Sequence, residues 1–177
     1  MRMDRCVLSV LLAFGTTVVS AAGAAAQEGR LPLPVFTVQA PDGVPVGSDA
    51  LSALPQWLLV YVDPATAPNA GLMRALQQCR SPQLVAKTVV VVAGSAAAGR
   101  RWLEQEFGEQ PLPFVWFADP EREAHTALEL PGAPMMAGIR NGKVAWRLIG
   151  ILSRPESLES IIRTWVEQGS EPEGGPR

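Results

Sequence analysis

Three apolar runs of strand length, each followed by a segment with helical periodicity, constrain the fold of this chain most strongly. The runs are WLLVYV (residues 57–62), KTVVVVAGS (residues 87–95) and PFVWFADP (residues 113–120). A strand that is apolar at successive positions is buried on both faces, as parallel strands covered by helices are. The alternation of strands and helices therefore predicts an α/β fold whose sheet is parallel in its centre.

Four segments repeat apolar side chains at the spacing of a helix. They are residues 69–79, 97–108, 120–130 and 154–169. In the segment 69–79, we expect Asn69 to accept hydrogen bonds from the free amides of the opening turn. In the segment 120–130, we expect Asp119 to be the N-cap and Pro120 to be the first helical residue. The second should end at Gly108. The last should turn four side chains inward: Leu158, Ile161, Ile162 and Trp165.

Two further segments have the pattern of antiparallel hairpins. Residues 34–46 place a Pro-Asp-Gly turn at 41–43 between two short strands, and residues 134–150 place Asn141-Gly142 between two longer ones. The second hairpin follows the last βα unit, so we expect a mixed sheet that is parallel in its centre and antiparallel at one edge, with the first hairpin as an N-terminal extension.

The chain divides into three parts by composition. Its 177 residues are 47% apolar and 18% charged, which suits a single domain with a substantial core, at residues 27–168. Residues 1–26 have the basic start, apolar run and small residues of a signal peptide; the alternative is an uncleaved membrane anchor, because the uncharged run is ~20 residues long. Residues 169–177 are Gly, Pro, Glu, Ser and Arg, and are predicted to be disordered.

Charge and residue type argue against several classes of function. The net charge is −2 and the basic residues are scattered, so no nucleic-acid partner is expected, and a membrane partner only if residues 1–26 stay uncleaved. No metal or other cofactor is expected, because the chain has one His, His125, and lacks a glycine-rich phosphate loop. Asp63 and Asp119 have two interpretations, a catalytic carboxylate pair or, favoured here, turn making and helix capping.

Particular stretches of the sequence resemble a known superfamily. The segments VFTVQAPDGVPVGSDAL (residues 35–51) and WLLVYVDP (residues 57–64) are similar to the opening of secreted thioredoxin-like proteins of the TlpA and redoxin type. The nearest match is to MauD-type accessory proteins of methylamine utilisation, in which a strand runs into Ser-Pro-Thr-Cys-Pro-x-Cys. RLIGILSRPESLESII (residues 147–162) resembles a later segment of the same family.

The resemblance implies a thioredoxin-like fold with the redox cysteine pair replaced. Thr66, Ala67, Pro68 and Asn69 stand at the positions of the Cys-x-x-Cys motif. The family also has a cis proline that shapes a groove for partner peptides, and Pro134, between Ala133 and Met135, fits it better than Pro131 does. Thiol-disulfide exchange requires a thiolate, and a threonine hydroxyl cannot replace one. We therefore expect no catalytic residue at this site, and no conventional thiol-disulfide oxidoreductase.

Cys79 is the only cysteine that would remain after signal cleavage. On a helix it would lie ~15 Å from the degenerate site, so it cannot take the place of the pair. A small buried cysteine is usually inert, and this is the favoured interpretation; the alternative is a free thiol that reacts with a partner.

Three hypotheses of function follow. The first is an exported, non-catalytic binding or accessory module for a protein partner or client peptide, which keeps the groove but not the redox centre. The second, implied by the resemblance, is a redox accessory protein that works through Cys79 or a partner's thiols in the maturation of a periplasmic dehydrogenase. The third is a degenerate paralogue with no client.

Four large side chains have expected positions in this fold. Met135 and Met136 border the groove in the first hypothesis, but core positions are an equal alternative for them. Trp116 and Trp146 are expected in the core.

Overall fold

The computed structural model describes residues 31–66, 68–78, 86–108, 112–150 and 155–168. The predicted signal peptide, the predicted disordered tail, Ala67 and Cys79 lie outside these residues. None of the described helices is long and apolar enough to span a membrane.

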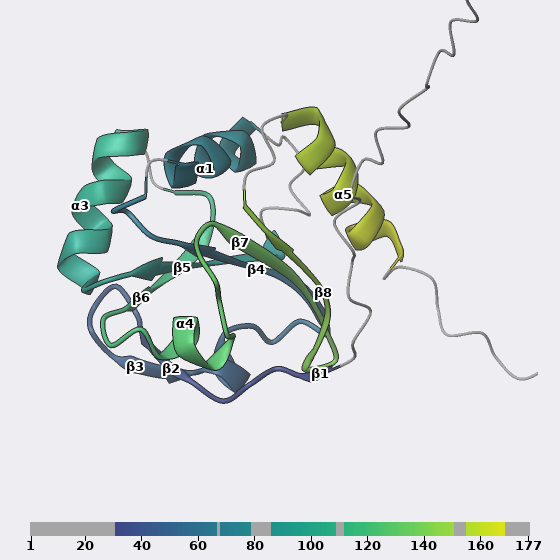
Figure 1. Cartoon of the computed structure of the whole chain (residues 1–177), viewed down its shortest axis with the longest axis horizontal. Coiled ribbons are helices and arrows are strands. Elements are labelled where there is room, and N and C mark those ends of the chain that lie inside the picture. The colour runs from purple at the N-terminus through teal and green to yellow at the C-terminus, as the bar shows by residue number, and fades with distance from the viewer. Residues whose placement is uncertain (1–30, 67, 79–85, 109–111, 151–154, 169–177) are drawn as a thin grey trace, which may run out of the picture.

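The described residues form a sheet of eight strands with helices on both faces (Figure 1). The strands are β1 Leu31–Pro32, β2 Thr37–Gln39, β3 Pro45–Gly47, β4 Gln56–Val62, β5 Thr88–Ala93, β6 Val115–Asp119, β7 Met135–Arg140 and β8 Lys143–Ile149. The helices are the 3₁₀ turn η1 Ser48–Ala50, α1 Pro68–Gln78, α3 Ala96–Phe107, α4 Glu123–Ala127 and α5 Pro155–Gln168.

The strand order is β1-β8-β7-β4-β5-β6-β2-β3. β4, β5 and β6 are parallel, as their apolar runs predicted, and β7 and β8 form the predicted hairpin at Asn141-Gly142. Antiparallel strands flank this centre on both sides, so the expectation of one antiparallel edge was wrong. The difference arises because the N-terminal hairpin extends the sheet: Gln39 in β2 pairs with Ala118 in β6.

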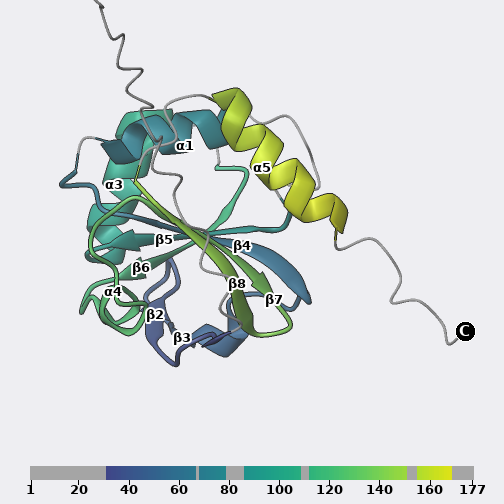
Figure 2. The ribbon, with the colours of Figure 1, turned by 45° about the vertical axis from the view of Figure 1, so that its right-hand side comes forward.

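The two faces of the sheet are covered differently. Figures 1 and 2 show α1, α3 and α5 together on one face, and α4 with the N-terminal hairpin on the other. Successive residues of β4 point to opposite faces. Leu58, Val60 and Val62 pack in the core under α1, α3 and α5, whereas Leu59 and Tyr61 pack in the core under α4. Both cores are therefore built from the same buried strand.

Local sequence explains both ends of α3. Ser95 caps α3 by accepting a hydrogen bond from the amide of Ala98, and Gly108 ends that helix with a φ of 73°.

The predicted inward side chains are mostly buried. In α5, Leu158, Ile162 and Trp165 are buried, as the periodicity predicted, whereas Ile161 is only half-buried. Trp116 and Trp146, expected in the core, are only half-buried and pack against it.

The prediction for the start of α4 was wrong. The helix begins at Glu123, and Arg122, with a φ of 55°, precedes it in the left-handed region. Asp119 is instead the last residue of β6. Its side chain still serves the helix from that position, because Asp119 Oδ2 accepts a hydrogen bond from the amide of His125 at 3.2 Å.

Candidate functional site

The segment that follows β4 makes a hydrogen-bonded turn before α1 begins at Pro68. Asp63 starts the turn: its Oδ1 accepts from the amide of Ala65 at 3.0 Å, and its carbonyl accepts from the amide of Thr66 at 2.9 Å. The carbonyl of Thr66 accepts in turn from the amide of Asn69 at 3.1 Å. Thr66 and Asn69 therefore lie where the sequence placed the degenerate motif, at the start of a helix.

Asn69 holds this turn through its side chain. The residue is 0% exposed, and its Nδ2 donates to the carbonyls of Asp63 and Thr66, both at 2.8 Å. The prediction that Asn69 would accept hydrogen bonds from helix amides was wrong, because its oxygen, Oδ1, is buried without a partner in the described part of the chain. The nitrogen is used because two loop carbonyls, which can only accept, face it.

Pro134 lies beside this turn, immediately before the neighbouring strand β7. β4 and β7 are antiparallel, with Tyr61 opposite Met135, so the residue before Met135, Pro134, comes level with the end of β4. The bond between Ala133 and Pro134 is cis, and the carbonyl of Pro134 accepts from the amide of Gly150 at 2.9 Å. Hence the turn and the cis proline meet at the same end of the sheet.

The methionines after Pro134 do not border an open surface. Met135 is 0% exposed and Met136 is 3% exposed, and they pack in the cores on opposite faces of the sheet. This decides between the two interpretations of the sequence in favour of core. Ala133, which is half-buried, packs against the core under α4.

An ion pair joins the turn to the start of α4. Arg122 Nη2 lies 2.7 Å from Asp63 Oδ2. The hydrogen bond to Asp63, and then its negative charge, raise the pKa of the Arg122 guanidinium above its ordinary value. Because half of the Arg122 side chain is exposed, we assign the contact an orienting role more than a large contribution to stability.

A buried network beneath the ion pair was missed by sequence reasoning. The Tyr61 hydroxyl donates to Asp119 Oδ2 at 3.1 Å, and the rings of Tyr61 and His125 lie 5.8 Å apart. Burial, and secondly the charge of Asp119, raise the pKa of Tyr61 above its ordinary value. Tyr61 belongs to an apolar run, so no local signal marks it. Asp63 makes a turn and Asp119 accepts from an amide of α4 here, which agrees with the favoured interpretation of these two residues as turn-making and capping groups.

The residues assembled at this site have little reactive chemistry. The Thr66 hydroxyl has no thiol beside it within the described residues, and His125 packs on Tyr61. Among the residues that the structure describes, no group of three or more His, Cys, Asp or Glu side chains could hold a metal ion. The arrangement fits a structural turn with a half-exposed hydroxyl.

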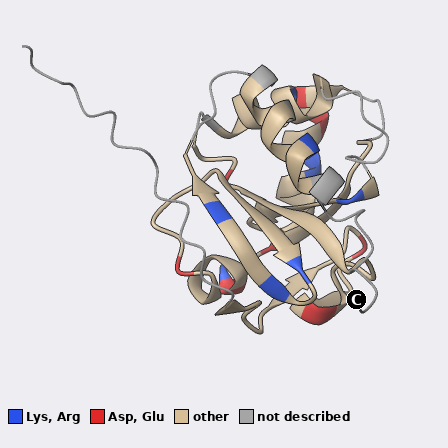
Figure 3. Ribbon diagram, turned by 90° about the vertical axis from the view of Figure 1, so that its right-hand side faces the viewer, with Lys and Arg blue, Asp and Glu red and all other residues tan. Residues whose placement is uncertain are grey.

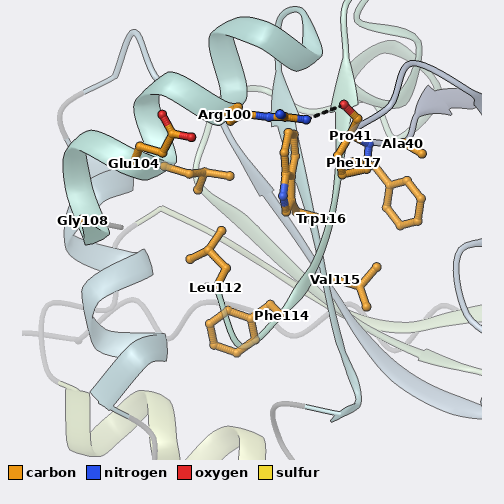
Figure 4. Close-up of a pocket in the computed structure, with 11 residues that line it drawn as sticks. Ala40, Pro41, Arg100, Glu104, Gly108, Leu112, Phe114, Val115, Trp116 and Phe117 are labelled. Atoms are coloured by element: carbon orange, nitrogen blue, oxygen red, sulfur yellow. Dashed lines mark hydrogen bonds between the residues drawn. The ribbon is translucent and has the colours of Figure 1, made fainter. Parts of the chain in front are cut away.

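A large open pocket lies elsewhere, beside β6 (Figure 4). Its volume is about 1060 Å³. It is lined by α3, by the turn that follows β2, and by the segment that leads into β6 together with the first residues of that strand. Arg100 in α3 donates to the carbonyl of Pro41 at 2.9 Å across one end, and Trp116 lies below that contact. Val115, on the strand itself, is 60% exposed. Sequence analysis predicted no binding surface there.

Comparison with solved structures places this geometry among known folds. A Chlorobium tepidum protein proposed to be the thiol:disulfide interchange protein DsbE matches with a TM-score of 0.60 and 20% identity, over 77% of this chain and 96% of that one. A secreted Mycobacterium tuberculosis disulfide oxidoreductase homologous to E. coli DsbE matches with a TM-score of 0.58 and 13% identity, over 73% and 95%. The exposed lipoprotein thioredoxin Etrx1 of Streptococcus pneumoniae matches with a TM-score of 0.50 and 13% identity, over 73% and 98%.

These similarities are structural. No protein-family model and no curated protein matches the sequence. At identities of 20% and below, the matches establish the fold and leave the chemistry to be argued from this chain's own residues. The predicted fold class is confirmed: the chain has a thioredoxin-like fold, the fold of known thiol:disulfide oxidoreductases.

Proposed function

We propose that this protein is an exported, non-catalytic binding module, which presents the surface around Thr66 and Pro134 to a protein partner or client peptide. The observation that carries the proposal is the turn before α1, where Thr66 supplies a hydroxyl and Asn69 a fully buried amide. These are the positions that the resemblance matches to the cysteine pair. Exchange between thiols and disulfides needs a thiolate that attacks sulfur, and neither group supplies one.

The remaining architecture supports binding at this place. A helix start, a cis proline and an exposed ion pair lie close together at one end of the sheet. Because Asn69 and Asp63 hold the turn by hydrogen bonds, little conformational freedom should be lost when a partner docks against it. We place the partner among secreted proteins, in accord with the signal-like residues 1–26 and with structural neighbours described as secreted or exposed.

The resemblance to MauD-type proteins suggests a more specific setting, the maturation of a periplasmic dehydrogenase. In this proposal the chain holds a client segment while another protein supplies the thiol chemistry.

Capture from a periplasmic extract tests the proposal. The purified chain is compared with Thr66→Arg, which places a long cation at the site, and with Pro134→Ala, which removes the ring beside it. A matched control is Val115→Arg, an exposed strand position in the pocket beside β6. We expect a specific protein to be captured by the wild type and by Val115→Arg, and to be lost in Thr66→Arg. Retention of every captured protein by both site variants would show that this surface is not the binding site.

A further inference from the structure

A second cluster of polar groups lies where α5 crosses β7, away from the turn before α1. Arg140, the last residue of β7, places its guanidinium carbon 4.5 Å from the ring centre of Trp165 in α5. Gln56, opposite Arg140 in β4, donates through its side-chain nitrogen to the backbone carbonyl of Trp165. All three side chains meet on the face of the sheet that α5 covers.

This cluster has unused hydrogen-bond donors. Nε and Nη2 of Arg140 are buried and have no hydrogen-bond partner in the described part of the chain, and the same is true of Nε1 of Trp165, a residue that is 6% exposed. The nearby carbonyl of Trp165 already accepts from Gln56. Buried donors without acceptors are costly, and a charged donor most of all.

The contact between Arg140 and Trp165 does not remove this cost. A guanidinium over an indole face gains cation–π attraction, but its N–H bonds point outward in its own plane and stay unsatisfied. Nε and Nη2 lie on one edge of that plane, the edge that carboxylates bind with two parallel hydrogen bonds. A carboxylate bound in this way lies in the guanidinium plane.

The charges on the hairpin itself have the sign that attracts an anion. The hairpin of β7 and β8 carries Arg140, Lys143 and Arg147 and no Asp or Glu, whereas α5 carries both signs. Figure 3 shows basic segments in blue on strands that face the viewer. Arg147 is engaged elsewhere, since it donates to the carbonyl of Leu128 at 2.8 Å. Arg140 as a whole is half-buried, although Nε and Nη2 themselves are buried.

We propose that Arg140 is a carboxylate-binding site, in which the carboxylate accepts two hydrogen bonds from Nε and Nη2 beside Trp165. Two sources supply this chemistry. One is the chain itself: Glu171 and Glu173 follow α5 in the sequence, and Glu171 is the third residue after Gln168, at which α5 ends. The other is a carboxylate on a separate molecule. The proposal is independent of what binds near Thr66.

Thermal unfolding of the full chain separates the two sources. If the chain supplies the carboxylate, the double variant Glu171→Gln/Glu173→Gln should lower the unfolding midpoint by a few °C, and Arg140→Met should lower it by a similar amount. Because both variants remove the same contact, the protein that carries all three substitutions should unfold at nearly the same temperature as either variant. The matched control is Glu121→Gln/Glu129→Gln, which changes the net charge by the same amount as the tail substitutions but at exposed positions elsewhere. We expect this control to leave the unfolding midpoint unchanged.

If a separate molecule supplies the carboxylate, the double variant Glu171→Gln/Glu173→Gln should have the unfolding midpoint of the wild type. Sodium acetate should then raise the wild-type midpoint more than sodium chloride does at equal ionic strength. Arg140→Met should abolish the difference between acetate and chloride. Arg140→Lys keeps the positive charge but lacks the pair of parallel N–H donors, so it should reduce the difference. In either case the Arg140 Nε–H should give a slowly exchanging signal in ¹⁵N NMR spectra when the carboxylate is bound. The proposal is overturned if neither the tail variant nor acetate has an effect that depends on Arg140.

Discussion

Asn69 and Tyr61 support the same loop from two sides. Asn69 holds the carbonyls of the turn from within α1, while Tyr61 binds Asp119, which in turn receives the amide of His125 at α4. The ion pair of Asp63 and Arg122 closes the connection between the turn and α4. In the described residues, the turn before α1 is thus held in place by hydrogen bonds and one ion pair, and its stability should respond to single substitutions.

Substitution of Asn69 tests the direction of its hydrogen bonds. Asn69→Ala removes two buried donations and should lower the free energy of unfolding by about 1–3 kcal/mol. Asn69→Asp should cost more, because it turns carboxylate oxygen toward the carbonyls of Asp63 and Thr66. Urea unfolding followed by tryptophan fluorescence measures both. If Asp is tolerated as well as Ala, the side-chain nitrogen does not hold the turn.

Titration of Tyr61 tests the buried network. Since folding raises its pKa above the ordinary ~10, the folded state favours the neutral phenol. This stabilisation is fully present below about pH 10 and is lost as the pH rises above that value. Tyr61 is the chain's one tyrosine, so tyrosinate absorbance near 295 nm reports it alone. We expect that absorbance to appear at higher pH in the folded chain than in urea; coincident titrations would contradict the network.

Between elements, α5 packs closely where it crosses the hairpin of β7 and β8. A Cβ added at Gly138 in β7 would come within 2.9 Å of Trp165 Cε2 and would also meet the ring of Trp146. The two indoles themselves are perpendicular, with ring centres 5.7 Å apart. The glycine is therefore required for the helix to approach the strand.

Gly138→Ala should lower the free energy of unfolding by about 1–3 kcal/mol through this crowding. Gly132→Ala is the control, because a Cβ at that position meets no atom within 4 Å. Denaturant unfolding of the two variants compares them. Equal stability of both would show that the indoles yield easily and that the packing is looser than described.

The elements that could be predicted from the sequence are those with a local physical cause. Continuous apolar runs identified β4, β5 and β6, and Asn141-Gly142 identified the last hairpin. The start of α4 was missed because Asp119 caps the helix from a strand, through a contact six residues along the chain. The antiparallel strands beside β6 depend on one non-local pairing, between Gln39 and Ala118, which no periodicity reveals.

The position of the candidate site could be predicted from the sequence, but the contacts that hold the site in place could not. The missing cysteines and Pro134 are visible in the sequence, and the structure brings the turn and the cis bond to the same end of the sheet. The donation by Asn69, the burial of Met135 and the unpartnered edge of Arg140 depend on contacts between separate elements. Such contacts leave no signal in a local pattern.

For the molecule as a whole, the fold does not depend on the chemistry it usually accompanies. Both cores are assembled from aliphatic and aromatic side chains of the sheet and its helices, and the turn before α1 is held by Asn69 and Asp63. A thioredoxin-like scaffold of this kind needs no cysteine in the described part of that turn. This is consistent with the binding role proposed above.

The central claim, that this scaffold performs no thiol-disulfide exchange, is tested most directly by the rate at which the purified chain reduces insulin disulfides in the presence of a dithiol. Wild type and Cys79→Ser are compared with a reaction that contains the dithiol alone. We predict that both proteins run at the rate of that background. A wild-type rate well above background would contradict the account, and its loss in Cys79→Ser would assign the activity to that thiol.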